Sequence, residues 1–201
     1  MSGLRESTRS KLKTVSTATL TTALFKRGLR NQFVQDVRPL NLNAGPMVGE
    51  AYTLRYIPAR EDLNPITVFR DRAHPQRRAI EECPPGAVLV IDSRKDARAA
   101  SAGSILVARL MKRGVAGVVT DGGFPDSPGL ARLAIPPQPP RPPAPHELPV
   151  HPAPPPTTPP AFAASPGVPV SLVAADRKRF VVLPPPPPAN NAPPARPLRP
   201  T

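Results

Sequence analysis

Two aspartates in the middle of the chain lie close enough in sequence to form a small polar site. Asp121 and Asp126 stand five residues apart, on either side of the pair Gly122-Gly123. Hard divalent cations prefer carboxylate oxygens, so this loop favours a site in which one of the two side chains binds a metal ion. Asp-Gly is also ordinary turn chemistry, and the spacing alone leaves a plain turn as the commoner interpretation.

A second loop offers backbone donors. The small-residue run Ala99–Gly103 leads directly into an apolar helical pattern that begins at Ser104. The first N–H groups of a helix have no partner within the helix and lie at the positive end of its dipole, so they suit a carboxylate or phosphate. The expected cradle consists of the amides of Gly103, Ser104, Ile105 and Leu106. Alternatively, Ser101 or Ser104 simply caps the helix, and the two interpretations are compatible.

The elements that position both loops form a βαβ unit. Ala87–Asp92 is a strongly apolar strand, Ser104–Arg113 is a helix that Gly114 ends, and Val115–Thr120 is a second buried strand. This connection predicts two parallel neighbours. Sites in open α/β sheets lie beyond the carboxyl ends of the strands, so the two loops should meet at one edge of the sheet. The sequence therefore predicts an α/β fold with its site at that edge.

The preceding residues alternate between helical and extended patterns. We expect a helix over Thr14–Arg27, capped by Ser16 or Thr17 and ended by Gly28. We also expect a strand over Gly49–Ile57, a helix in the later part of Phe69–Glu82, and a turn at Pro84–Gly86.

Proline divides the chain. Nine of the 34 prolines lie in residues 1–135 and 25 lie in residues 136–201. Because proline removes a backbone donor and fixes φ, such a density does not suit central strands or helix interiors. We predict an α/β domain over residues 1–135 and a Pro-rich, low-complexity and largely disordered tail over 136–201. One apolar island in that tail predicts a short strand pair within residues 167–183.

Charge and cysteine content restrict the class of protein. The formal net charge is +13, spread along the chain, which favours a generally basic surface. We do not expect a nucleic-acid site, because Lys26-Arg27 with Arg30 and Arg77-Arg78 are short clusters without interleaved aromatics. A single cysteine, Cys83, fits a reducing compartment and is expected to be a small buried apolar residue. No apolar run spans a membrane and residues 1–13 do not resemble a secretory signal, so we expect a cytoplasmic protein.

Three segments of the central part resemble the signature of the RraA-like family. They are Pro85–Asp92 (PGAVLVID), Gly103–Ala108 (GSILVA) and Arg113–Gly123 (RGVAGVVTDGG). Ser16–Leu24 and Val37–Leu40 are similar to the N-terminal region of the family, and Gly167–Pro184 is weakly similar to a late strand and hairpin. The resemblance covers roughly residues 10–135. The family includes the regulator of ribonuclease activity A and the class II 4-hydroxy-4-methyl-2-oxoglutarate aldolases.

The resemblance implies a fold, an assembly and a chemistry. The fold is a swivelling β/β/α (phosphohistidine-domain-like) domain, here incomplete because proline runs replace later strands, and the assembly is a homotrimer with sites between subunits. Enzymatic members of the family are carbon–carbon lyases, either pyruvate aldolases or oxaloacetate decarboxylases. They use Mg2+ or another divalent metal to cleave a small 2-oxo acid.

Carried over residue by residue, the resemblance implies substrate binding by the amides of Gly103 to Leu106. It implies a catalytic and metal-binding role for Asp126, and a catalytic role for Ser104, which stands where aldolases have an acidic residue. Pro125 stands where the family has the arginine that pins the substrate carboxylate. Arg94 and Arg98, nearby in sequence in the first loop, are the candidates to substitute partly for it.

Two functions therefore remain open. One is a metal-dependent lyase, inactive in this chain if the place of the lost arginine stays empty. The other is a non-catalytic regulator that binds a ribonuclease through protein contacts. The tail is interpreted either as a Pro-rich docking arm or as the product of a disturbed reading frame.

Overall fold

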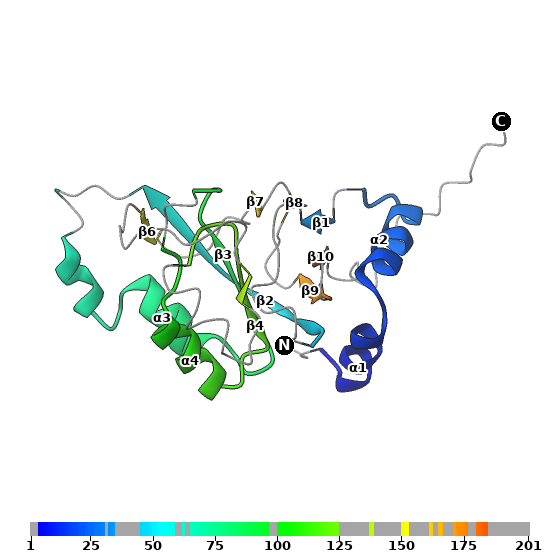
Figure 1. Cartoon of the computed structure of the whole chain (residues 1–201), viewed down its shortest axis with the longest axis horizontal. Helices are drawn as coiled ribbons and strands as arrows, with labels where there is room; N and C mark the ends of the chain where they lie inside the picture. The colour runs from blue at the N-terminus through cyan, green and yellow to red at the C-terminus, as the bar shows by residue number, and fades with distance from the viewer. Residues whose placement is uncertain are drawn as a thin grey trace, which may run out of the picture.

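A computed structural model describes the central part of the chain and several shorter segments (Figure 1). The described residues are 4–30, 32–34, 45–58, 62, 65–96, 100–124, 137–138, 150–152, 161–162, 165–166, 171–176 and 180–184. Within them the helices are α1 (Glu6–Thr14), α2 (Thr17–Lys26), η1 (Ile66–Arg70, a 3-10 helix), α3 (Pro75–Glu82) and α4 (Ser104–Lys112). The sheet begins with β1 (Phe33–Val34), β2 (Met47–Pro58), β3 (Val88–Asp92) and β4 (Gly117–Thr120). The later strands are β5 (Pro137–Gln138), β6 (Val150–Pro152), β7 (Ala161–Phe162), β8 (Ser165–Pro166), β9 (Leu172–Ala175) and β10 (Phe180–Leu183).

One mixed sheet of eight strands organises these elements, in the order β1-β10-β9-β2-β3-β4-β5, with β6 also paired to β2. The long strand β2 joins two halves of different kind. Its first residues, Met47 to Glu50, pair antiparallel with β9, and its middle residues, Ala51 to Arg55, pair parallel with β3. We call β2-β3-β4 with α3 and α4 the parallel half, and β1-β10-β9 with α1 and α2 the antiparallel half.

The predicted βαβ unit is confirmed. Strands β3 and β4 are parallel neighbours, with Val88 opposite Gly117 and Ile91 opposite Thr120. Both are fully buried, as their continuous apolar runs indicate. The alternation of β3 explains why both faces are covered. Leu89 and Ile91 pack into the core beneath α3 and α4, whereas Val88 and Val90 pack into a second core with residues of β9 and β10.

The strand pair expected within residues 167–183 is present as β9 and β10. They pair antiparallel, and β9 lies beside β2, so the pair extends the sheet. Val173 and Phe180 are buried in the second core. Four of the eight strands of the sheet, β5, β6, β9 and β10, thus come from beyond residue 135, while the division into an α/β domain and a Pro-rich tail stays a prediction. The mixed α/β class is confirmed; the swivelling β/β/α architecture by name also stays a prediction.

The turn after β9 also contacts the N-terminal part of the chain. The Asp176 carboxylate accepts hydrogen bonds from the backbone N–H and the hydroxyl of Thr17, at 3.0 and 2.6 Å. Thr17 is the first residue of α2, so a negative charge lies at the positive end of this helix. Ser16 caps the same helix through the N–H of Thr19, as the sequence predicts. The described tail residues therefore help to position α2.

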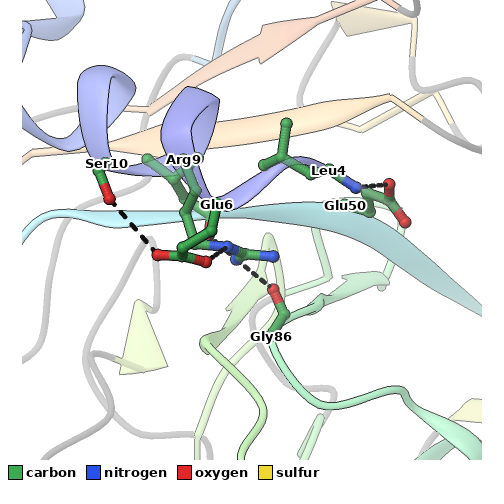
Figure 2. A network of polar contacts seen from close by, with 7 residues as sticks. Leu4, Glu6, Arg9, Ser10, Glu50 and Gly86 are labelled. Atoms are coloured by element: carbon green, nitrogen blue, oxygen red, sulfur yellow. Dashed lines mark hydrogen bonds and ion pairs between the residues drawn. The ribbon is translucent and has the colours of Figure 1, made fainter. Parts of the chain in front are cut away.

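Helix α1 was not expected from the sequence, and none of its nine residues is buried. It is attached by polar contacts that Figure 2 shows. The Arg9 guanidinium donates to the carbonyls of Val48 and Gly86, at 2.6 and 2.7 Å, and the N–H of Leu4 donates to the Glu50 carboxylate. One arginine thus joins α1 to the start of β2 and to the turn before β3. No helix among the described residues is long and apolar enough to cross a membrane.

Candidate functional site

Two loops meet at the carboxyl edge of the parallel half, the one from β3 to α4 and the one after β4. The chain leaves β3 at Asp92 and enters α4 at Ser104, and it leaves β4 at Thr120. Ala100 and Gly123 form a parallel bridge, and the N–H of Ser101 donates to the Gly123 carbonyl at 2.9 Å. The sequence-based expectation that the loops after β3 and β4 share one edge is therefore confirmed.

Two buried carboxylates fix the first loop. Asp121 accepts hydrogen bonds from the backbone N–H groups of Ser93 and Lys95 through its two oxygens, at 2.6 and 3.1 Å. Asp92 accepts the intervening N–H of Arg94 at 3.0 Å. Together they take three successive amides and hold Arg94 and Lys95 at φ of 58° and 60°. Non-glycine residues in this left-handed region cost roughly 1 kcal/mol or more each, so the carboxylates offset local strain.

Among the described residues, an ion pair is formed by Asp92 and not by Asp121. The second oxygen of Asp92 lies 2.9 Å from the Arg55 Nε, which comes from the adjacent strand β2. Burial and the nearby Asp92 raise the pKa of Asp121, although the amides of Ser93 and Lys95 act against that rise. Since each Asp121 oxygen accepts a backbone amide, this side chain acts as a support for the loop.

A buried cluster of hydroxyls lies beneath the junction of the loops. Ser101 Oγ lies 2.8 Å from Thr120 Oγ1 and 3.0 Å from Ser93 Oγ. The N–H of Gly122 donates to Thr120 Oγ1 at 3.0 Å. A Cβ on Gly122 would lie 2.6 Å from the hydroxyls of both serines, so only glycine fits this close approach. The cluster thus binds the start and the end of the β3–α4 loop to the end of β4 in a single rigid unit.

The start of α4 faces this unit with its backbone donors. Gly103 is the N-cap, with extended backbone, and within the described part of the chain no side chain caps the helix. The first intrahelical bond runs from the Val107 N–H to the Gly103 carbonyl. The expectation that Ser101 or Ser104 caps the helix is wrong, since Ser101 Oγ is held by the hydroxyl cluster and Gly103 is the N-cap. The amides of Ser104, Ile105 and Leu106 remain as the expected cradle, and Ile105 is 82% exposed.

Comparison with known proteins assigns this arrangement to a family. A family model described as RraA-like (Aldolase/RraA) matches residues 17–139, more than half of the chain. The chain belongs to the RraA-like family. This confirms the family that the signature segments resemble.

Solved structures similar to this RraA-like chain agree with that assignment. The structure of Streptomyces coelicolor RraAS2, described as an unusual member of the RNase ES inhibitor RraA family, is 27% identical. The match covers 92% of this chain and 87% of that one, with a TM-score of 0.77. The RNA-processing inhibitor RraA of Thermus thermophilus, 22% identical, matches 86% of this chain and 96% of that one with a TM-score of 0.59, which shows the fold alone. No curated protein matches the sequence.

Several residues that the family resemblance singles out lie outside the described residues. They are Pro125, Asp126 and Arg98. No group of three or more His, Cys, Asp or Glu side chains that could hold a metal ion occurs among the described residues. The magnesium prediction rests on Asp126 and stays a prediction. Arg94 is described and exposed, on the turn that Asp92 and Asp121 hold.

Sequence reasoning missed the residues that build the support of this RraA-like site. Tyr56 of β2 donates its hydroxyl to the Ser101 carbonyl at 2.7 Å, and Gln76 of α3 donates to that same hydroxyl at 2.8 Å. Burial raises the pKa of Tyr56 well above its usual range, so the phenol remains a donor. The position of Asp92 at the end of an apolar strand marks it in the sequence as a candidate site residue. Tyr56 and Gln76 carry none, because only the fold brings their strand and helix to Ser101.

Proposed function

We propose that this RraA-like chain is a divalent-metal-dependent lyase that cleaves or decarboxylates a small 2-oxo acid. The observation that carries the proposal is the uncapped start of α4, placed beside two loops that buried carboxylates and hydroxyls hold rigid. Preorganised amides that face a carboxylate need no reorganisation during the reaction, and this is the main source of electrostatic catalysis. Gly103 as the N-cap leaves those amides open.

The described residues of this site bind and orient. The amides of Ser104, Ile105 and Leu106 hold the substrate carboxylate at the positive end of the helix dipole. Ser104, half-buried at the first helical position, carries a hydroxyl that relays a proton at its Oγ. A divalent metal held by Asp126 would supply Lewis-acid polarisation of the 2-oxo group. Asp121 and Asp92 act indirectly, by fixing the loop that carries Arg94.

The site lacks the arginine that the family places against the substrate carboxylate. Pro125 offers neither a charge nor a donor where the family places arginine. Arg94 and Lys95 are exposed on the strained turn and are the nearest described cations in the first loop. We propose that Arg94 partly takes the vacant role and that Pro125→Arg raises lyase activity at least tenfold, since a charged hydrogen bond to a developing charge contributes about 1.5–3 kcal/mol.

Pyruvate release from oxaloacetate tests the lyase, with and without magnesium, on protein shown to be folded by circular dichroism. A sharper test uses Ser104→Pro against Ser104→Ala. Proline is tolerated at the first helical position and the extended backbone of Gly103 accepts it, so Ser104→Pro removes one cradle amide without ending the helix. We expect Ser104→Pro to lose at least tenfold more activity than Ser104→Ala. Folded wild-type protein without metal-dependent turnover would refute the lyase.

The second candidate is a non-catalytic regulator that binds a ribonuclease by protein contact. Pro125 favours it, and so do the descriptions of the S. coelicolor and T. thermophilus structures as inhibitors. Titration of the chain into an RNase ES cleavage assay tests this candidate. Inhibition that Ser104→Pro leaves unchanged would support the regulator. We also propose a homotrimer, which light scattering of the eluted protein would measure.

A further inference from the structure

The α1–α2 end of the antiparallel half carries a concentrated positive charge. Residues 1–30 contain seven of the 27 basic residues and one of the 14 acidic residues, a net charge of +6; the other 171 residues share +7. In Figure 1 helices α1 and α2 lie together at one end of the molecule, away from α3 and α4. This charge is therefore a local feature of one end, over and above the general basicity of the chain.

Most of these cations form no ion pair that would stabilise the fold within the described residues. Arg9 joins α1 to β2 and the turn before β3, and pairs with Glu6. The other six are exposed, and none of them forms an ion pair within the described part of the chain: Arg5, Lys11, Lys13, Lys26, Arg27 and Arg30. Exposed like charges repel one another, so their concentration on two adjacent helices opposes folding slightly. A polyanionic ligand would remove that repulsion.

An exposed aromatic ring lies within this positive surface. Phe25 is 61% exposed, one of two large apolar side chains that the described residues leave to solvent. The Arg30 guanidinium carbon lies 5.9 Å from the centroid of its ring. Lys26 and Arg27 directly follow Phe25, so two further cations lie at the same end of α2. The expectation that this cluster lacks a neighbouring aromatic is therefore wrong, because Phe25 adjoins Lys26 in the sequence and its ring is exposed.

A defined backbone turn holds the ring and the guanidinium together. Gly28 has φ of +83°, its N–H donates to the Phe25 carbonyl, and the Leu29 N–H donates to the Leu24 carbonyl. These two bonds form a Schellman motif, which reverses the chain and brings Arg30 back over Phe25. The arrangement is thus built into the end of α2, and a side chain at residue 28 would strain it.

We infer that the end of α2, from Phe25 to Arg30, together with the cations of α1, binds single-stranded nucleic acid. Phosphates contact the cations, and a base stacks on the exposed ring of Phe25 beside Arg30. Single-strand binding surfaces combine these two elements, a positive track and an aromatic platform. The carboxylates of an acidic protein segment would use the cations but do not stack on the ring, so nucleic acid is the ligand that uses both elements, and polyglutamate serves as the competing ligand in the test.

The first experiment measures binding of a fluorescent 12-nucleotide oligo(U) by anisotropy, across a range of salt concentrations. Log affinity for single strands falls with log salt with a slope of about −0.7 for each phosphate neutralised. We expect Lys26→Gln/Arg27→Gln to reduce the magnitude of that slope by about 1.4. The matched control, Arg70→Gln/Arg72→Gln, removes the same charge from exposed positions on and just after η1 and should leave the slope unchanged. Equal effects of the two variants would overturn the proposal.

The second experiment tests the ring. Phe25→Leu keeps an apolar side chain at an exposed position, so folding should be preserved, and circular dichroism checks it. We expect oligo(U) to bind this variant about five- to tenfold more weakly, as expected for one lost stack, while an abasic oligomer of equal length binds both proteins equally. Unchanged oligo(U) affinity in Phe25→Leu, or competition by polyglutamate as strong as that by oligo(U), would overturn the nucleic-acid assignment. So would the absence of binding at low salt.

Discussion

The two halves of the sheet hold their helices by different means. In the parallel half, α3 and α4 bury Ile80, Val107 and Leu110 in an apolar core. In the antiparallel half, α1 buries no residue and is held by the guanidinium of Arg9, and the first residue of α2 is held by the carboxylate of Asp176. Apolar packing thus anchors α3 and α4, polar contacts anchor α1, and α2 combines a polar contact at its start with the buried side chain of Leu24.

This difference reflects how far apart in the sequence the contacting residues lie. The parallel half forms mostly from one continuous stretch, whose contacts are close in sequence. The polar contacts of the antiparallel half join residues 77 positions apart for Arg9 and Gly86, and 159 apart for Thr17 and Asp176. Contacts at such separations require the rest of the fold to be in place before they stabilise anything. We therefore expect the antiparallel half to open more readily than the parallel half.

The largest effect should come from the core of the parallel half. Leu110→Ala removes a fully buried side chain of α4 and leaves a cavity, so the free energy of unfolding should fall by about 3 kcal/mol. Chemical denaturation measures the change. Ile105→Ala, on the same helix but 82% exposed, is the matched control and should change stability by less than about 0.5 kcal/mol. Similar losses in both variants would contradict an apolar anchor for α4.

A smaller and more local effect should come from Arg9→Met. This variant removes the charged hydrogen bonds to the Val48 and Gly86 carbonyls, which should cost about 2 kcal/mol in total. Hydrogen exchange should then show α1 losing protection while β3 keeps it. Arg5→Met, an exposed neighbour, should leave α1 protected. Loss of protection throughout the sheet would mean that α1 is integral to the core.

The contact between α2 and the β9–β10 turn should be weaker still. Asp176→Asn keeps an acceptor for Thr17 but removes the negative charge at the helix start, so we expect a loss of about 1 kcal/mol. A double-mutant cycle with Thr17→Val separates this contact from the other interactions of Asp176. Additive effects of the two substitutions would show that the contact does not couple the tail to α2.

The sequence predicted the parallel half better than the antiparallel half, for a physical reason. The apolar runs at Val88–Asp92 and Gly117–Thr120, with a helix between them, allow little besides parallel neighbours. Helix α1 buries nothing, so it has no apolar period to detect. The strand pair β9–β10 was detectable as an apolar island, but its place beside β2 depends on a pairing about 125 residues distant in sequence.

The candidate site was predictable in outline only. The small-residue loop before Ser104 and the strand ends at Asp92 and Thr120 indicated where the loops meet. The role of Asp121 was not predictable: its spacing from Asp126 left a plain turn and a metal ligand open, whereas in the structure it holds the amides of Ser93 and Lys95. That role requires knowledge of a neighbouring loop 28 residues earlier in the chain, which no local pattern contains.

Chemical labelling of Cys83 tests directly whether the two halves of the sheet open separately. This thiol is fully buried in the core of the parallel half, and burial raises its pKa from 9.0 to about 12. A raised pKa means that the neutral thiol stabilises the fold fully below pH 9 and that this contribution is lost as the pH rises toward 12. At pH 8 the native protein should therefore react with iodoacetamide only when the parallel half opens. Leu110→Ala should accelerate the reaction strongly, whereas Arg9→Met should leave its rate unchanged. Faster labelling of Arg9→Met would show that the two halves open together, and the distinction between them would fail.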